Sequence, residues 1–440
     1  MLLSFKTSNF KAFQHEVCLN MVPAKVDEFS YSVLKKEYRG KMGQALCSSV
    51  IYGPNAAGKS TIVHAMSCLK NIILRGDIND DVNECDDIVS NHMSLIPFLG
   101  NDATVPTMFE IEFIFESHKY LYRVAAEFGA FAEPNYRRRI VEERLDVDDY
   151  LVFLRTPDDI AVSHLTKIKD LLLEGFKLPL ANRNLEISKS NLSPRTLFLT
   201  SDFDSIISKK IPSGIKKWLR DDFIVINRSG LKNLRPLLVA DENIHLVEGS
   251  LNLLARESGI IGSDFGYHKT KEGKTELLSI VSQGQGRAIT LPSELIESQG
   301  TLRLITMAPY LFDVIEQGGT LIVDEFDTSL HPMIIMNILN IFHNDEVNQN
   351  KAQLVFNTHN PIYLDNQLLR RDEIKFVEKD KKTKASILYA LSDFKTSGPS
   401  GVRNTTDYMK NYFVNRFGAI ENIDLSDLFL TVASKGGSDA

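Results

Sequence analysis

Three short, continuous apolar runs predict buried strands of a parallel sheet. They are residues 49–52, 320–323 and 353–356, each four residues long and rich in apolar or β-branched side chains. A glycine or a polar residue follows each run directly. Because an open α/β sheet places ligand chemistry beyond the carboxyl ends of its strands, the residues after these runs are the first candidates for a functional site.

Two other patterns predict the rest of the fold. Apolar and polar residues alternate with period two over 109–115, and residues 120–124 are expected to pair with them across a turn. Residues 140–145 are expected to extend the same antiparallel lobe. From about 158 to 265, apolar positions recur at helical spacing, without a long heptad array. Prolines interrupt this segment, which predicts a compact helical insertion that covers a core face or binds a partner. The prolines are Pro179, Pro194, Pro212 and Pro236.

The segment after the first apolar run fits the phosphate-binding pattern G-x-x-x-x-G-K-[ST]. A helix is expected to begin at about Lys59, so that its positive dipole end and the loop N–H groups face one concavity. Lys59 adds a full charge, and the Ser60 hydroxyl can bind Mg²⁺. The sequence therefore predicts a nucleoside triphosphate site. Its candidate contacts here are Gly53, Asn55, Ala56, Ala57, Gly58, Lys59, Ser60 and Thr61.

The second apolar run ends in an acidic pair, Asp324-Glu325. At the carboxyl end of a buried parallel strand, Asp324 can complete the shell of Mg²⁺ while Glu325 polarises the attacking water. An ordinary acidic pair at a strand end is the alternative, but the phosphate-binding pattern in the same chain favours the catalytic interpretation.

Two further motifs indicate an ATPase. Ser298 precedes a helical pattern that begins near Leu302, so it can cap that helix, while Gly300 permits close approach of another backbone. The third apolar run leads into Asn-Thr-His-Asn-Pro and leaves His359 at a strand end. A simple N-cap and a satisfied polar histidine are the structural alternatives.

In order, these motifs resemble those of the ABC-type ATPase heads of the SMC, RecF and OLD families. Residues 53–60 resemble Walker A, 298–300 the signature, Asp324-Glu325 Walker B, and His359 the switch histidine. The resemblance implies a head with a mixed sheet, an antiparallel β lobe and an inserted helical domain. It also implies that Ser298 and Gly300 of one head cap the ATP of another, so that hydrolysis requires a dimer. Residues 327–332 would then lie at the dimer interface, and the 9–13 turn near the base.

The chain is similar, more narrowly, to stand-alone prokaryotic anti-phage ATPases of the RloA/AbiL type. The similarity rests on the motif forms at 297–301, 324–332 and 357–361 and on the tail at 412–420. It implies a separately encoded TOPRIM-like nuclease as effector. Two departures are that Ala56 replaces a glycine common in ABC loops, and that no Q-loop glutamine can be assigned, since Gln283 and Gln285 come too late in the chain.

Composition narrows the class of partner. A net charge of −7 over 440 residues argues against a uniformly basic nucleic-acid coat, although short basic groups occur at 137–139, 209–210, 216–217 and 379–384. No leader or long apolar stretch is present, which predicts a cytoplasmic protein without a membrane partner. The cysteines lack paired zinc-site spacing and are interpreted as core or incidental thiols. They are Cys18, Cys47, Cys68 and Cys85.

These observations together predict a homodimeric or higher-order ATPase, using ATP and Mg²⁺, that controls an effector in phage defence. The predicted domains are 1–157 and 266–440, which form the ATPase head, and the helical insertion 158–265 between them. The alternatives are a RecF/SMC-like DNA-binding ATPase in DNA repair and a transporter ATPase. Nucleic acid or a phage component is a further candidate partner.

Overall fold

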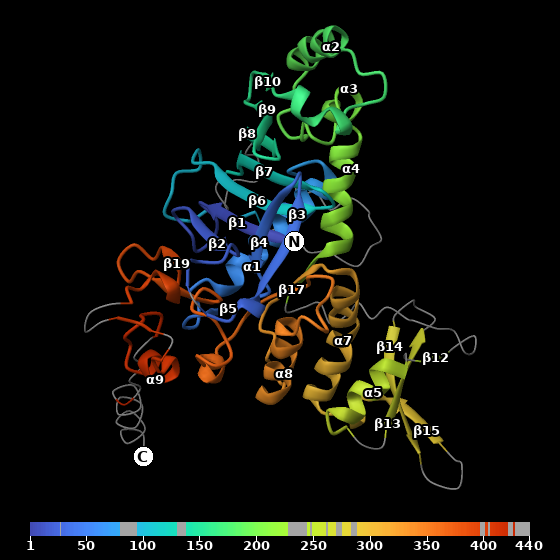
Figure 1. The fold of residues 1–440 in the computed structure, drawn as a ribbon, viewed down its shortest axis with the longest axis vertical. Coiled ribbons are helices and arrows are strands. Elements are labelled where there is room, and N and C mark those ends of the chain that lie inside the picture. Colours follow the sequence, from blue (N-terminus) through green and yellow to red (C-terminus); the bar gives the residue numbers. More distant parts are fainter. Residues whose placement is uncertain are drawn as a thin grey trace, which may run out of the picture.

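The computed structural model describes most of the chain, and Figure 1 shows the arrangement of its elements. The fold is mixed α/β, as the sequence predicts, and the described residues form two large and two small sheets. The described residues are 1–26, 28–79, 95–129, 138–227, 244–246, 249–260, 263–269, 275–282, 288–396, 401–403, 405–420 and 426. The residues discussed above that lie outside them are Cys85, Arg137, Pro236, Gln283 and Gln285.

A six-stranded sheet carries the candidate site. The three strands predicted from the apolar runs are β5, β16 and β17, which lie side by side, are parallel and are entirely buried. Their carboxyl ends therefore share one edge. In order, the sheet contains β11 (Phe223–Ile226), β16 (Thr320–Val323), β17 (Gln353–Asn357), β5 (Ser48–Tyr52), β18 (Ile374–Lys379) and the antiparallel edge strand β19 (Ser386–Ala390).

Both faces of this sheet are covered, which explains the continuous apolar runs. On one face, Ile51 and Val355 share a core with α1 (Lys59–Arg75). On the other face, Val50 and Phe356 share a core with α7 (Gln299–Gln317) and α8 (Pro332–His343). Alternate residues of each strand point to opposite faces, and both faces are buried. A polar side chain on either face would therefore need a hydrogen-bond partner inside the protein.

A seven-stranded antiparallel sheet forms the predicted lobe and packs on the outer side of α1. The 109–115 and 120–124 patterns belong to the hairpin of β6 and β7, and the 140–145 segment belongs to β8. In order, the sheet contains β10 (Ile160–Val162), β9 (Tyr150–Arg155), β8 (Arg139–Val147), β7 (His118–Glu127), β6 (Thr107–Phe115), β1 (Leu2–Ser8) and β2 (Val17–Asn20). A small hairpin, β3 (Val33–Tyr38) and β4 (Lys41–Leu46), precedes β5.

Within the described residues, the segment expected to be helical from 158 to 265 contains both helices and strands. Up to Asp222 its helices are the 3₁₀-helix Leu165–Leu171, α2 (Leu178–Ser190), α3 (Asp202–Ile206), α4 (Lys210–Lys217) and a π-helical turn, Trp218–Asp222, and one further helix, α5 (Gly249–Glu257), follows later. After Asp222 the chain enters the central sheet as β11, because Phe-Ile-Val-Ile is a short apolar β-branched run that pairs with β16. Trp218 stacks on Phe113 at 3.8 Å between ring centroids and joins this segment to the lobe. The domain boundaries themselves stay a prediction.

A second small sheet extends from α7, as Figure 1 shows in yellow. It contains β12 (Ile244–Leu246), β13 (Ser263–Lys269), β14 (Thr275–Ser282) and β15 (Ala288–Pro292), with α5 (Gly249–Glu257) and α6 (Ser293–Ile296) beside it. The C-terminal part adds short helices at Pro361–Tyr363 and Leu391–Asp393 and α9 (Tyr408–Phe413). Within the described residues, no helix has the length and apolar character needed to cross a bilayer.

Candidate functional site

The phosphate-binding loop joins β5 to α1, and α1 begins at Lys59 as predicted. Gly58 caps the helix with a left-handed φ of 111°, a conformation that glycine adopts at low cost. Ala56 is also left-handed, with a φ of 58°, at a position where the ABC loops that this segment resembles commonly have glycine. For alanine this conformation costs about 1 kcal/mol, so the loop retains its shape at some expense of stability.

The side chain of Lys59 lies inside the loop. Its Nζ donates hydrogen bonds to the carbonyl oxygens of Gly53 at 2.7 Å and Pro54 at 2.9 Å. Nζ also lies 3.3 Å from Nδ1 of His359. Burial lowers the pKa of the Lys59 ammonium group to about 8, although the nearby acidic pair acts in the opposite direction. The negative charge of a bound phosphate would stabilise the protonated form of this buried amine.

The acidic pair follows β16 and is held by one amide. Nδ2 of Asn357, at the end of β17, donates to Oδ1 of Asp324, while the backbone N–H of Glu325 donates to Oδ1 of Asn357 at 2.6 Å. Arg303 of α7 donates to the carbonyl oxygens of Asp324 at 3.4 Å and Glu325 at 3.3 Å. Glu325 has a φ of 49°, an unusual value for a non-glycine residue. Its backbone is therefore fixed from two sides.

Neither Asn357 nor Arg303 was identified from the sequence. Asn357 is the first polar residue after the third apolar run, next to the predicted histidine, so its position could have indicated a role. Arg303 lies within the apolar pattern of α7 and is 93% buried, which a pattern of hydrophobic positions cannot predict for an arginine.

His359 and the first two residues of the 327–332 segment, Asp327 and Thr328, line one open hollow. The hollow has a volume of about 630 Å³ and is lined by Asn55, Glu325, Asp327, Thr328, His359, Asn360 and Pro361. The Thr358 hydroxyl donates to Oδ2 of Asp327 at 2.7 Å, and burial raises the pKa of that carboxyl group. Burial and the Lys59 charge lower the pKa of His359, which favours the neutral imidazole. The phosphate loop, the acidic pair and the histidine thus meet at one edge of the sheet.

The signature residues lie at the start of α7, outside the residues that line this hollow. Ser298 caps α7, its hydroxyl accepting from the Thr301 N–H at 3.1 Å, and it is exposed. A Cβ added to Gly300 would lie 2.5 Å from the carbonyl oxygen of Ser329. The close backbone approach expected at Gly300 is therefore present, and its partner is the segment that follows the acidic pair.

The N-terminal turn lies against the phosphate loop. Phe10 and Phe13 form a β-bridge, and a Cβ added to Gly58 would lie 3.0 Å from the Cβ of Ala12. Nζ of Lys11 contacts Nδ1 of His64 on α1, and the Ser386 N–H donates to the Ala12 carbonyl at 2.8 Å. The turn thus connects the loop to the edge of the central sheet.

The donor set beside the loop suits Mg²⁺. Ser60 offers a hydroxyl oxygen and Asp324 a carboxylate oxygen, and oxygen ligands are those that this hard cation prefers. The Ser60 side chain is exposed, whereas Asp324 is buried and its Oδ1 is already hydrogen-bonded to Asn357. Asn357 therefore orients the carboxylate whose oxygens would hold the cation.

Comparison with known families identifies the class of this chain. Residues 48–365 match the family described as "AAA domain, putative AbiEii toxin, Type IV TA system". The match covers most of the chain and includes the phosphate loop, the acidic pair and His359, so the chain belongs to this family of AAA-type ATPase domains. Among solved structures, the SMC head domain from Thermotoga maritima is similar at 13% identity and a TM-score of 0.37, over 88% of this chain and 98% of that one. No curated protein matches the chain.

Proposed function

We propose that this chain binds and hydrolyses ATP, dimerises around it, and controls a separately encoded effector in anti-phage defence. The observation that carries the enzymatic part is that Glu325 and His359 line one hollow, and that Nζ of Lys59 lies 3.3 Å from Nδ1 of His359. Each comes from a different strand end of the central sheet: β5, β16 and β17. An incidental acidic pair or an isolated histidine would have no reason to lie beside a phosphate loop.

The chain's own residues have distinct roles in this mechanism. The loop N–H groups and Lys59 would hold the phosphates, and Ser60 and Asp324 would hold Mg²⁺, which when bound neutralises phosphate charge. Glu325 orients the attacking water and takes its proton. His359, in the neutral form favoured by its surroundings, donates a hydrogen bond at the terminal phosphate. Asn357 and Arg303 keep the acidic pair in place while ATP binds and leaves.

The dimeric part of the proposal comes from the position of the signature. Ser298 and Gly300 do not line the hollow next to their own phosphate loop, yet Ser298 is exposed at a helix N-terminus, where anions bind well. A second copy can present this helix end to the nucleotide. Packing of Gly300 on Ser329 would couple the signature of one copy to the segment that follows its own acidic pair.

The role in defence is supported by the motif resemblance to RloA/AbiL-type ATPases and by the family description, which names a toxin of a type IV system. A nuclease of the TOPRIM kind is the proposed effector. The proposed setting is the cytoplasm. Isolation of the chain from its native host would identify the effector, whereas strong, salt-dependent DNA binding by the chain alone would favour a RecF/SMC-like repair protein.

The nucleotide assignment is tested by Lys59→Ala. Removal of the ammonium group should abolish measurable ATP binding in calorimetry, because the main positive charge of the loop is lost. Lys70→Ala on the same helix serves as the control, since its Nζ donates to the Phe223 carbonyl outside the loop. Unchanged ATP affinity in a folded Lys59→Ala protein would exclude this loop as the site.

A further inference from the structure

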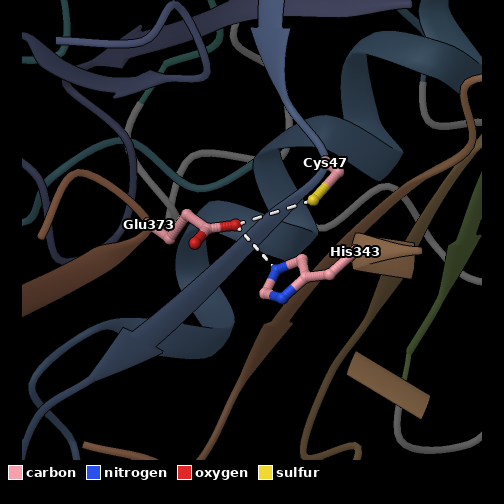
Figure 2. Close-up of side chains that lie close together, drawn as sticks. All are labelled: Cys47, His343 and Glu373. Atoms are coloured by element: carbon pink, nitrogen blue, oxygen red, sulfur yellow. Dashed lines mark hydrogen bonds and ion pairs between the residues drawn. The ribbon is translucent and has the colours of Figure 1, made fainter. Parts of the chain in front are cut away.

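Three side chains with metal-binding groups converge in the interior, at the end of β5 opposite to the phosphate loop. Figure 2 shows Cys47, His343 and Glu373 pointing toward one another. Oε1 of Glu373 lies 3.0 Å from Nε2 of His343 and 3.7 Å from Sγ of Cys47. The three side chains come from different elements: the β4–β5 connection, the last residue of α8 and the residue before β18. All three residues are at least 94% buried.

The separations between these atoms resemble those around a tetrahedral metal ion. Zn²⁺ lies about 2.3 Å from sulfur and about 2.0–2.1 Å from nitrogen or oxygen, so its ligand atoms are roughly 3.2–3.8 Å apart. The two distances from Glu373 are close to that range, and all three ligand atoms lie within 4.8 Å of one another. Small side-chain adjustments would therefore be enough to surround an ion.

Neighbouring groups hold the carboxylate in position. The backbone N–H of Arg370 donates to Oε2 of Glu373 at 2.9 Å, and the Ser48 hydroxyl donates to Oε1 at 2.8 Å. The Glu373 carbonyl accepts from the Val50 N–H at 2.9 Å, which fixes the backbone at the same point. Such outer contacts orient the ligands of metal sites and contribute to metal affinity.

We propose that Cys47, His343 and Glu373 bind one Zn²⁺ ion that stabilises the fold, with a water molecule as the fourth ligand of its tetrahedral shell. Sulfur, imidazole nitrogen and carboxylate oxygen form a set typical of zinc and unlike the all-oxygen set of Mg²⁺. On binding, the ion replaces the thiol proton of Cys47 and any proton on Nε2 of His343, and these protons are released to solvent. The Glu373 carboxylate binds the ion without releasing a proton. This proposal is independent of the ATPase function.

The position of the cluster explains why the role would be structural. Cys47 and Glu373 directly precede the amino ends of β5 and β18, whereas the phosphate loop follows the carboxyl end of β5. An ion here would join two adjacent strands of the central sheet to the end of α8. It would stabilise the sheet from the end opposite to the nucleotide. Sequence spacing could not reveal the site, because the ligands are separated by 296 and 30 residues along the chain.

The test is the metal content of the full chain, produced with zinc in the medium and purified without an immobilised metal column. We expect about one zinc per chain by mass spectrometry of the metal. After zinc removal and Co²⁺ addition, a sulfur-to-cobalt charge-transfer band should appear. Cys47→Ser should abolish that band, and His343→Gln should weaken Co²⁺ binding by more than about 100-fold, since loss of an outer contact alone typically costs 10- to 100-fold.

Cys68→Ser is the matched control, because Cys68 is also a buried thiol but lies on α1, outside the cluster. It should retain the zinc and the cobalt band. Absence of both stoichiometric zinc and the cobalt band in the unmodified chain would overturn the proposal and leave the cluster as an internal hydrogen-bonded group. Since that result concerns the unmodified chain, it does not depend on whether the variants fold.

Discussion

At the residue scale, one side-chain amide organises the acidic pair. Asn357 accepts from the Glu325 N–H and donates to the Asp324 carboxylate, so the orientation of its amide is fixed by chemistry. The left-handed backbone of Glu325 and the contact from buried Arg303 belong to the same arrangement. A strained backbone of this kind persists only where its surroundings determine it, and these contacts provide that restraint.

Glu325→Gln should separate binding from hydrolysis. The amide cannot accept a proton from water, whereas Lys59, Ser60 and Asp324 are unchanged, so ATP should still bind while turnover falls by roughly 10²-fold or more. ATP-bound dimers should accumulate in size-exclusion chromatography. Glu316→Gln, the same chemical change at an exposed position of α7, should leave the rate unaltered. Near-normal turnover by Glu325→Gln would show that another group activates the water.

The stability of the fold should depend on the protonation of His64. Burial, and then the charge of Lys11, lower the pKa of His64 to about 4, whereas an unfolded histidine titrates near 6.5. Between these values the unfolded chain binds more protons, so the free energy of unfolding should decrease as the pH falls from about 6.5 toward 4. Urea unfolding at several pH values measures this. His64→Gln should remove that part of the dependence; an identical pH profile would contradict it.

At the element scale, continuous apolar runs predicted β5, β16 and β17, and the alternating segment 109–115 and its continuations predicted β6, β7 and β8, whereas other strands such as β11 and β15 were not predicted. Runs such as 320–323 are continuous because alternate residues enter the cores on either side of the sheet. By contrast, β15 is exposed along its whole length, so burial imposes no apolar pattern on it. β11 has an equally continuous apolar run, Phe-Ile-Val-Ile, but it directly follows a helical segment, and a short apolar run does not by itself distinguish a strand from a buried stretch of helix.

The residues of the candidate site likewise fall into those that the sequence predicted and those that only the fold reveals. Motif residues such as Lys59 and Asp324 could be predicted because their chemistry requires fixed spacing next to strand ends. Asn357 and Arg303 act through contacts between elements that are far apart in the sequence. Cys47 could not be connected with His343 and Glu373, since only the folded sheet brings them together.

Gly300→Ala should test the packing of α7 on the segment after the acidic pair. Its φ is not left-handed, so the requirement for glycine is one of space, because the new Cβ would lie 2.5 Å from the Ser329 carbonyl oxygen. We expect a loss of about 1–3 kcal/mol in the free energy of unfolding, measured by denaturant titration. Gly249→Ala, at the start of α5, where no other described residue, apart from the adjoining backbone, lies within 4 Å of the added Cβ, should have little effect. Equal effects of both changes would contradict this packing argument.

At the scale of the whole molecule, the phosphate loop and the signature face different surroundings. The loop lies beside the hollow with His359, whereas Ser298 is exposed at the start of α7, where its hydroxyl contacts Thr301. A second copy could complete each site by placing its α7 end against the nucleotide. Turnover by the unmodified chain should then increase more steeply than linearly with protein concentration, until the dimer is fully formed.

Ser298→Arg should leave the chain folded and able to bind ATP but unable to hydrolyse it, because a bulky cation at the helix end prevents closure over the partner's nucleotide. The loss of the helix cap accounts for only about 1 kcal/mol of stability, and Ser298→Ala controls for that effect without added bulk.

Mixing Ser298→Arg with Lys59→Ala gives mixed dimers in which one composite site carries both lesions and the other carries neither. Random pairing should therefore restore about a quarter of the normal ATPase rate. If differential tagging confirms mixed dimers but no activity returns, the two sites do not act independently, and an active Ser298→Arg monomer would refute the dimeric mechanism itself.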